Sequence, residues 1–437
     1  MKRILLSLGL IATLVAGFAC ERRDAGGSTD DGGPIRVGVY VDLTGQTSSF
    51  GQSTKNGIQM AADEINKAGG INGRQVQLVI EDDQGLPAQA ATVVTKLINQ
   101  DKVHAVLGEV ASSNTLAAAP KAQEAKIPMI TPSSTNPKVT QVGDYVFRVC
   151  FIDPFQGEVM AKFAANTLKA KTAAVLTDVN SDYSRGLDQF FTENFTKLGG
   201  RIVEKQSYTQ TDQDFSGQLT AIRSANPDVI YLPGYYGQVG VIAKQSKQLG
   251  IKAPLLGGDG WDAPQLFQLG GDALNGSFFS NHYSYEDARP EVKAFVDAYR
   301  ARFNAVPDAI AALAYDAMKV LADSIKRAGT TNGPKLRDAI AQTANFLGVT
   351  GTISINQDRN AVKPATVFEL QAGKYVFREN IYPEGMTPPS TAPATTASPG
   401  TSNTANTAPA ANANTAASPA ASNTAKTANT ANTANTR

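Results

Sequence analysis

Two short hydroxyl-rich segments contain the side chains that are most able to do chemistry in this sequence. The first, residues 112–115 (Ser-Ser-Asn-Thr), separates an apolar run from an alanine-rich one, and the second, residues 131–135, contains Ser133 and Thr135. Hydroxyls beside the unpaired N–H groups that begin a helix can bind a carboxylate or a phosphate. Ser112 and Thr135 could equally be ordinary helix caps, which contribute about 1 kcal/mol each. Their positions alone favour neither role.

Acidic and aromatic side chains elsewhere have complementary chemistry. Asp259 lies in the glycine-rich segment 257–260, where it could be a turn residue or accept hydrogen bonds from an ammonium group. Tyr183, Tyr235 and Phe50 offer flat apolar surfaces, and the two tyrosines add a polar tip. A carboxylate-binding segment, an ammonium acceptor and aromatic walls together predict a binding site for an amino acid.

Residue patterns typical of catalysis are absent from the sequence. The two histidines are His104, inside an apolar strand-like run, and His282, inside an aromatic run, and neither has a nucleophile pattern beside it. There is no Gly-x-Ser-x-Gly motif, no paired-histidine zinc motif and no Walker loop. Asp82 and Asp83 lack the further oxygen ligands of a metal site, so we expect a solvated loop or a helix cap there. We therefore expect a binding protein without catalytic residues, metal or cofactor.

The elements that would position these residues alternate between short apolar strands and longer amphipathic helices. The predicted strands cover residues 35–41, 75–81, 103–107, 128–131, 172–177, 201–207, 228–232 and 254–257. The predicted helices cover residues 51–68, 87–100, 116–125, 156–169, 184–198, 215–224 and 237–249. This alternation predicts right-handed parallel units with helices on both faces of a sheet, and its two runs predict two similar lobes. Because ligands bind at the carboxyl ends of parallel strands, we expect the candidate residues to meet in a cleft between the lobes.

The beginning of the chain has the pattern of an export signal. A basic start precedes an apolar run over residues 4–19, which is too short to span a bilayer and is typical of a secretory signal peptide. Cys20 follows directly, as in bacterial lipoprotein signals, and its lipidation would anchor the protein to a membrane surface. The alternative is ordinary cleavage that leaves no lipid. We exclude residues 1–20 from the fold and expect residues 21–34 to be a flexible tether.

Composition and charge limit what the C-terminal segment can form and which partners the protein can bind. Residues 387–437 consist almost entirely of Thr, Ala, Asn, Ser and Pro. Such a segment cannot bury enough apolar surface to offset the entropy of ordering, so we expect it to be disordered. The formal net charge is +1 and no basic cluster is present, so nucleic acid is not an expected partner. Cys150, the only other cysteine, is expected to be a buried apolar residue.

Six segments carry a specific combination of motifs. They are IRVGVYVDLTGQTSSFGQS from residue 35, AADEINKAGGINGR from 61, VLGEVASSNT from 106, IPMITPSSTNPKVT from 127, YLPGYYGQVG from 231 and PDAIAALAYDAMK from 307. Together they resemble the substrate-binding proteins of branched-chain amino acid ABC transporters, the leucine/isoleucine/valine-binding family of type I periplasmic binding proteins. The resemblance covers roughly residues 35–385.

This resemblance implies an architecture. The fold would be α/β, with two similar doubly wound parallel-sheet lobes, a three-segment hinge and a ligand cleft between the lobes. Lobe 1 would contain residues 35–153 and 283–360, and lobe 2 would contain residues 154–282 and 361–386.

The resemblance also implies roles for the candidate residues. The family's ligand-binding positions fall on Ser112, Ser133 and Thr135 for the carboxylate, Asp259 and Tyr235 for the ammonium group, and Phe50 and Tyr183 for the side chain. Asp259 replaces a glutamate of the best-known members, and Ile310 replaces a tyrosine of many members. A pocket discriminates one methylene by only about 1–3 kcal/mol, so these departures leave the identity of the ligand open.

The implied function is transport. The protein would be an exported monomer, in the periplasm or at the cell surface, that closes on an amino acid at its hinge and delivers it to the membrane permease subunits of an ABC importer. The alternative is a ligand-sensing receptor module for amino acids or amides. A sensor typically carries a transmembrane segment or an output domain, and we find neither pattern after residue 20.

Overall fold

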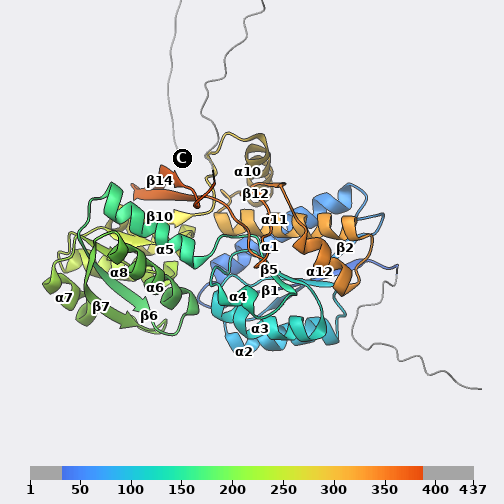
Figure 1. Ribbon diagram of the computed structural model, residues 1–437, viewed down its shortest axis with the longest axis horizontal. Coiled ribbons are helices and arrows are strands. Elements are labelled where there is room, and N and C mark those ends of the chain that lie inside the picture. The colour runs from blue at the N-terminus through green and yellow to red at the C-terminus, as the bar shows by residue number, and fades with distance from the viewer. Residues whose placement is uncertain (1–31, 387–437) are drawn as a thin grey trace, which may run out of the picture. The chain divides into compact units, whose positions relative to one another are not determined.

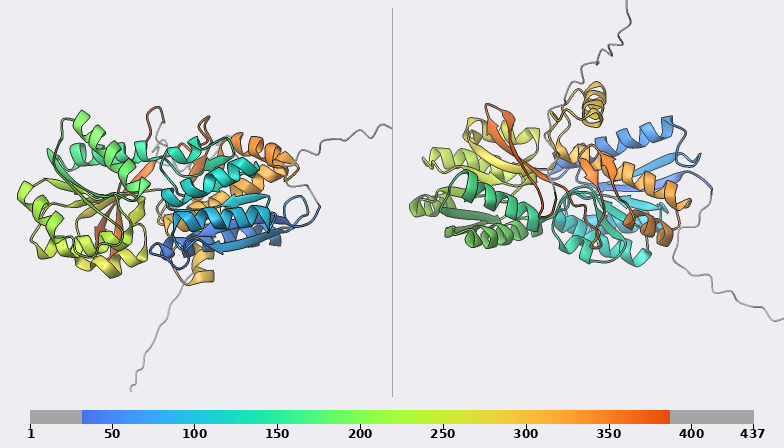
Figure 2. Two further views of the ribbon diagram at one scale, coloured as in Figure 1. Left: turned by 90° about the horizontal axis from the view of Figure 1, so that it is seen from below. Right: turned by 45° about the horizontal axis from the view of Figure 1, so that its top comes forward.

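The structure is a computed structural model that describes residues 32–386. The predicted signal peptide over residues 1–20, the lipidation of Cys20 and the disorder predicted for residues 387–437 lie outside the described residues, as does most of the predicted tether. The described chain contains two large sheets, each covered by helices on both faces (Figures 1 and 2). We call each sheet with its helices a lobe.

Lobe 1 is built around a five-stranded parallel sheet in the order β2-β1-β3-β4-β5. Its strands are β1 (Ile35–Val41), β2 (Val76–Asp82), β3 (Ala105–Leu107), β4 (Met129–Thr131) and β5 (Val146–Arg148). Its helices are α1 (Ser48–Lys67), α2 (Pro87–Asn99), α3 (Ser112–Ala125), α4 (Lys138–Gln141), α10 (Pro290–Phe303), α11 (Ala309–Ala328) and α12 (Gly333–Ala341), and β11 (Phe346–Gly348) pairs with β12 (Gly351–Ile353).

The two faces of β1 explain why its sequence is apolar almost throughout. Val37 and Val39 point to a cluster that includes side chains of α1 and α11. Tyr40 points to the opposite face, where it packs with side chains of α2 and α3. Successive side chains of a strand alternate between faces, so a strand that is covered on both sides must be apolar at both sets of positions.

Lobe 2 is built around a seven-stranded sheet in the order β14-β13-β10-β9-β8-β6-β7. Its strands are β6 (Thr172–Asp178), β7 (Arg201–Tyr208), β8 (Val229–Tyr231), β9 (Leu255–Gly257), β10 (Ser277–Asn281), β13 (Ala365–Gln371) and β14 (Lys374–Ile381), of which β13 and β14 are antiparallel to their neighbours. Its helices are α5 (Asp153–Lys162), which continues as the π-helical turn η1 (Phe163–Thr167), α6 (Asp182–Lys197), α7 (Ser216–Ala225), α8 (Tyr236–Gln248), α9 (Pro264–Gly270) and the 3₁₀ turns η2 (Asp259–Trp261) and η3 (Gly271–Leu274).

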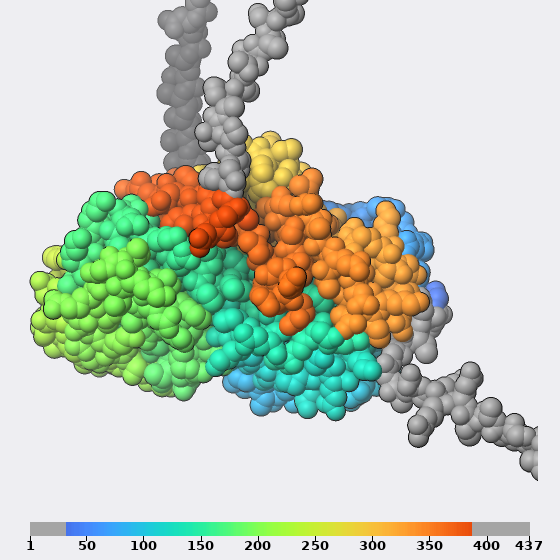
Figure 3. All heavy atoms as spheres, viewed as in Figure 1, coloured from blue at the N-terminus to red at the C-terminus, as the bar shows by residue number. Residues whose placement is uncertain are grey.

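The chain passes between the two sheets three times. The first crossover follows β5, the second follows β10 and the third joins β12 to β13. In Figure 3 the last part of the described chain, orange to red, borders atoms of both lobes. The two mainly parallel sheets and the three crossovers confirm the predicted fold class. None of the helices within residues 32–386 combines the length and apolar character needed to cross a membrane.

Several element boundaries differ from the prediction. Helix α1 begins at Ser48 and α3 at Ser112, before the predicted starts at residues 51 and 116, because the hydroxyl residues are helical and do not form a turn. Strand β3 begins at Ala105, so His104 lies just before the strand.

The solvated loop expected at Asp82 and Asp83 is not what the structure shows for Asp83. Asp83 is fully buried, and not in a solvated loop; burial raises its pKa to about 7, and the charges of Asp42 and Asp82 add to the rise. Asp82 accepts hydrogen bonds from the N–H groups of Leu43 (2.9 Å) and Gln84 (2.9 Å), so it connects the two loops. Within residues 32–386 no three His, Cys, Asp or Glu side chains are grouped so that they could hold a metal ion.

The contact between α1 and α11 leads to a stability prediction. A Cβ added at Gly57 of α1 would lie 2.2 Å from the carbonyl oxygen of Ala311 in α11. Gly57→Ala is expected to lower the free energy of unfolding by about 1–3 kcal/mol, because two helix backbones would have to separate. Gly217→Ala in α7 is the matched control, since nothing lies within 4 Å of a Cβ at that exposed position. Urea unfolding measures both, and equal losses in the two variants would contradict the close helix contact.

Candidate ligand-binding site

The candidate residues stand at the carboxyl ends of parallel strands or on the helix that faces them. They are Phe50 in α1, Ser112 at the start of α3, Ser133 and Thr135 after β4, Tyr183 after β6, Tyr235 after β8 and Asp259 after β9. Strands of one parallel sheet end at one edge, so the fold gathers residues that are far apart in the chain at the edges of the two sheets.

Five of the seven candidates line one small closed space between the lobes. This pocket is small, with room for about one water molecule (about 10 Å³). Its walls are formed by Phe50, Val110, Ser133, Tyr183, Tyr235, Asp259, Gly260 and Ile310, all of them buried. Ser112 and Thr135 are also buried but are not among the wall residues. The structure therefore brings together residues from both lobes around one small space.

Two hydroxyl groups of lobe 1 lack partners. Ser133 Oγ and Thr135 Oγ1 are buried and have no hydrogen-bond partner within residues 32–386. An unpaired buried hydroxyl costs about 1–3 kcal/mol. Ser133 lines the pocket, so a polar group bound there would supply its missing partner. Ser112 differs, because its Oγ accepts a hydrogen bond from Asn136 N (3.3 Å) and keeps its own proton for a further acceptor. Helix α3 is capped by Ala111, so the capping alternative is wrong for Ser112.

The neighbouring polar residues hold the loops of lobe 1 together. The carbonyl oxygen of Glu109 accepts hydrogen bonds from Thr131 Oγ1 (2.6 Å), Ser134 Oγ (2.9 Å) and Thr115 Oγ1 (3.2 Å). The Glu109 carboxyl accepts the N–H of Ala111, and burial raises its pKa well above the usual range. These bonds fix the backbone on either side of Ser133, whose unpaired hydroxyl is therefore held in place.

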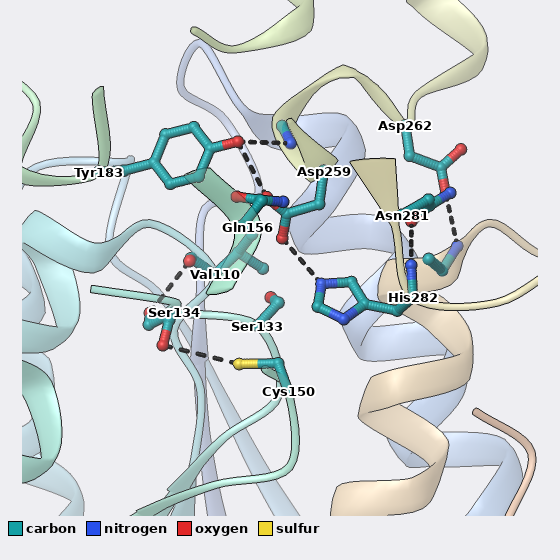
Figure 4. Close-up of polar contacts among 12 residues, drawn as sticks. Val110, Ser133, Ser134, Cys150, Gln156, Tyr183, Asp259, Asp262, Asn281 and His282 are labelled. Atoms are coloured by element: carbon teal, nitrogen blue, oxygen red, sulfur yellow. Dashed lines mark hydrogen bonds and ion pairs between the residues drawn. The ribbon is translucent and has the colours of Figure 1, made fainter. Parts of the chain in front are cut away.

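Asp259 is the centre of the polar side of lobe 2 (Figure 4). Its Oδ1 accepts hydrogen bonds from Tyr183 OH (2.8 Å) and Gln156 Nε2 (2.9 Å). Its Oδ2 lies 2.9 Å from His282 Nε2. A carboxylate offers about four acceptor positions, so three are occupied and one remains on Oδ2 for a donor in the pocket.

Aromatic rings form the apolar wall. The rings of Tyr183 and Tyr235 are stacked with centroids 5.1 Å apart, and Phe50 meets Tyr235 edge-on at 6.0 Å. Burial raises the pKa of both tyrosines well above the usual range, so their hydroxyls remain neutral. Ile310 completes the wall from α11. An apolar wall between polar ends suits a ligand with an aliphatic side chain.

Sequence reasoning did not find three polar residues of this region, Asp153, Gln156 and His282. Both carboxyl oxygens of Asp153 are buried without a hydrogen-bond partner in the described part of the chain. Burial raises its pKa to about 8, and the nearby Thr135 hydroxyl opposes the rise without reaching hydrogen-bond geometry. His282 directly follows β10, so the strand-end rule could have found it. Gln156 lies within α5, and no sequence pattern near it marks it as a site residue.

Hydrogen bonds join the lobes on both sides of the pocket. On one side, Asp182 N at the start of α6 donates to Ser113 Oγ (2.9 Å), and Asn136 Nδ2 donates to Asp182 O (2.8 Å). On the other side, Tyr236 OH donates to Gln46 O (3.1 Å). The structure therefore represents a conformation that is closed over the pocket.

A further tie between the lobes starts from the turn that contains Asp259. Asp262 Oδ2 accepts hydrogen bonds from Ala309 N (2.7 Å), the first residue of α11, and from Asn281 Nδ2 (2.9 Å) at the end of β10 (Figure 4). Trp261 is buried in the same turn, and its Nε1–H donates to Leu232 O (3.1 Å). One short turn therefore contacts the pocket, the core of lobe 2 and a helix of lobe 1.

The family model that matches the chain is described as periplasmic binding protein and covers residues 34–374. The Leu/Ile/Val-binding protein BraC3 of Rhizobium johnstonii is 32% identical over 348 residues, which are 79% of this chain and 94% of that protein. The leucine-, isoleucine-, valine-, threonine-, and alanine-binding protein of Pseudomonas aeruginosa is 32% identical over 354 residues, or 80% of this chain and 92% of that protein.

Solved structures agree with these relatives. The leucine binding protein LivK of Thermotoga maritima is 42% identical with a TM-score of 0.78, and the match covers 80% of this chain and 100% of that one. The substrate binding protein LivJ of Streptococcus pneumoniae, solved in complex with isoleucine, is 36% identical with a TM-score of 0.77 and the same coverage. The prediction of a binding protein and not an enzyme is confirmed by this family. The chain belongs to the type I periplasmic binding proteins, in the family of branched-chain amino acid binding proteins.

Proposed function

We propose that this chain is the substrate-binding protein of a branched-chain amino acid ABC transporter. The observation that carries the proposal is the pocket between the lobes, which has the unpaired hydroxyl of Ser133 on lobe 1 and a carboxylate with one open acceptor position, Asp259, on lobe 2. A zwitterionic amino acid has the two charged groups that match these walls. Relatives that bind leucine, isoleucine and valine support the same ligand class.

Different residues would contact the carboxylate, the ammonium group and the side chain of the ligand. The hydroxyls of Ser112, Ser133 and Thr135 would donate to the ligand carboxylate, with the N-terminus of α3 adding its positive end. Asp259 would accept from the ammonium group, and Tyr235 with the Ser133 carbonyl would complete that end. The side chain of the ligand would lie against Phe50, Tyr183 and Ile310.

Closure of the hinge would couple binding to transport. We take the closing units to be residues 35–153 with 283–360 and residues 154–282 with 361–386, supported by the two sheets. Hydrogen bonds such as Ser113 to Asp182 form only when the lobes meet, so the ligand-bound closed form presents a surface that the open form lacks. The permease subunits of the transporter would recognise that closed surface and receive the amino acid.

The family is periplasmic, so the protein is exported. We propose in addition that Cys20 is lipidated after removal of residues 1–19 and anchors the protein to a membrane surface. The support is the basic start, the apolar run and the cysteine directly after it.

The ligand class is tested by stabilisation. L-Leucine, L-isoleucine or L-valine at 100 times its Kd is expected to raise the free energy of unfolding by about 2.7 kcal/mol. 4-Methylpentanoate, which is leucine without its ammonium group, is expected to give a much smaller effect, because it leaves the Asp259 charge unpaired. Thermal unfolding with each compound measures this. If no α-amino acid in the panel raises the midpoint, the proposed function is wrong.

Removing the Thr135 hydroxyl tests the proposed binding of the ligand carboxylate. Thr135→Val is expected to raise the Kd for L-leucine about ten- to a hundredfold, because a charged group loses a buried donor. Thr331→Val is the matched control, since Thr331 Oγ1 is also buried without a partner in the described chain but precedes α12, outside the pocket walls. Isothermal titration measures both, and wild-type affinity in Thr135→Val would remove this hydroxyl from the site.

The anchor is tested by fractionation. Cys20→Ala is expected to move the exported protein from the membrane fraction to the soluble fraction, because the thiol that carries the lipid is missing. Cys150→Ala is the control, since Cys150 is buried and free, and this variant should stay with the membrane. Mass spectrometry of the mature N-terminus identifies the lipid. An unmodified N-terminus in the wild type would exclude the anchor.

A further inference from the structure

A buried histidine, His282, lies beside the candidate ligand site and has no role in the proposed function. The side chain of His282, on the second crossover, is fully buried. Its ring stacks on Phe151 of the first crossover with centroids 3.7 Å apart and planes 24° apart. Its backbone N–H donates to Asn281 Oδ1 (2.8 Å), so both the ring and the backbone are held in place. Figure 4 shows the imidazole directed at Asp259.

The protonation of this imidazole follows from its partners. An ionised carboxylate can only accept hydrogen bonds, so Nε2, at 2.9 Å from Asp259 Oδ2, carries a proton. Nδ1 is buried and has no partner within residues 32–386, so no acceptor is in place for a second proton. Burial lowers the pKa of His282, and Asp259 opposes that effect. The ring is therefore neutral at pH 7, with the proton on Nε2.

The other titratable groups near the ring come from the first and third crossovers. Lys363 of the third crossover lowers the pKa of His282 further, and its Nζ is held by Val149 O (3.3 Å) and by Thr350 Oγ1. On the first crossover, burial raises the pKa of the Cys150 thiol to about 12, so the thiol is neutral. Burial raises the pKa of Asp153, at the start of α5, to about 8, and the charge of Asp259 adds to that rise.

Asp262, three residues after Asp259, is the other acidic residue of this segment. Burial raises the pKa of Asp262, which faces Ala309 and Asn281 and not the ring. Asp259 is therefore the acidic partner of His282, and the charge of Lys363 opposes protonation of the ring.

We propose that His282 is a positioning residue of the ammonium subsite, which holds the Asp259 carboxylate towards the ligand when neutral and competes with the ligand when protonated. This inference rests on the proposed function, because it requires a ligand with an ammonium group. A neutral ring leaves one acceptor position of Asp259 for the ammonium group. A protonated ring places a second cation against the same carboxylate, so the ligand and the second proton weaken each other's binding.

The sign of the pH effect follows. Affinity is expected to be constant above the pKa of free His282, which burial keeps below its ordinary value, and to fall at lower pH by at most about tenfold per pH unit. Binding on the acid side should release one proton. The ligand is expected to lower the pKa of the ring, because its ammonium charge opposes a second positive charge beside the same carboxylate.

The first experiment uses the wild-type chain, which has just two histidines. Imidazole ¹⁵N and ¹³C NMR spectra of the full chain are recorded with and without saturating L-leucine, between about pH 5 and about pH 8. His282→Gln identifies the signals of His282. We expect the Nε2–H form at neutral pH and a titration midpoint that falls by about one pH unit with leucine, equivalent to tenfold in affinity.

The second experiment measures the Kd for L-leucine by isothermal titration over the same pH range. His282→Gln keeps an N–H donor near the position of Nε2 and is expected to bind within about threefold of wild type at neutral pH but to lose the acid weakening that a second proton causes. His282→Met removes the donor and is expected to raise the Kd about ten- to a hundredfold. His104→Gln, which removes the other buried histidine, should keep the wild-type pH profile.

The outcomes separate the two proposals. Absence of leucine binding by the wild type would overturn the proposed function and this inference with it. Leucine binding with an unchanged His282 midpoint, or with the same pH profile in His282→Gln as in wild type, would overturn the inference alone. The NMR measurement decides even if His282→Met does not fold.

Discussion

Closing two lobes on an α-amino acid removes water from both of its charges, and the polar groups around the pocket are arranged to meet that cost. In the closed structure Ser133 and Thr135 present hydroxyls without partners, and Asp259 has one acceptor position left. In the proposed function a bound ligand would supply their missing partners. Closure without a ligand leaves them unpaired and costs free energy, so the closing equilibrium depends on the amino acid itself.

The two lobes meet this constraint in different ways. In lobe 1 the candidate hydroxyls of Ser133 and Thr135 project from a loop whose backbone is fixed by buried hydrogen bonds, such as those from the Arg148 guanidinium to Ser134 O (2.5 Å) and Asn136 O (2.8 Å). In lobe 2 a single carboxylate is held by side chains from α5, α6 and the second crossover. A rigid set of donors therefore faces an acceptor whose orientation depends on three separate elements.

The sequence predicted the two lobes well, because strands and helices alternate with a clear period and polar residues follow the strands. Ser133 and Asp259 could be singled out in this way, since each lies two residues after the end of a buried strand. Gln156 could not, because it lies within a helix and its partner Asp259 is 103 residues further along the chain. The burial of Asp83 was also beyond local reasoning, since a pair of acidic residues after a strand is polar in sequence whether or not the fold covers it.

The segment formed by η2 and the residue after it carries two acids with different contacts, Asp259 at the pocket and Asp262 at the first residue of α11. They are three residues apart, and the buried Trp261 between them leaves little freedom for one to move alone. A substitution in this segment therefore alters the pocket and the contact with α11 together. In the proposed function, solute preference and the stability of the closed form would change together.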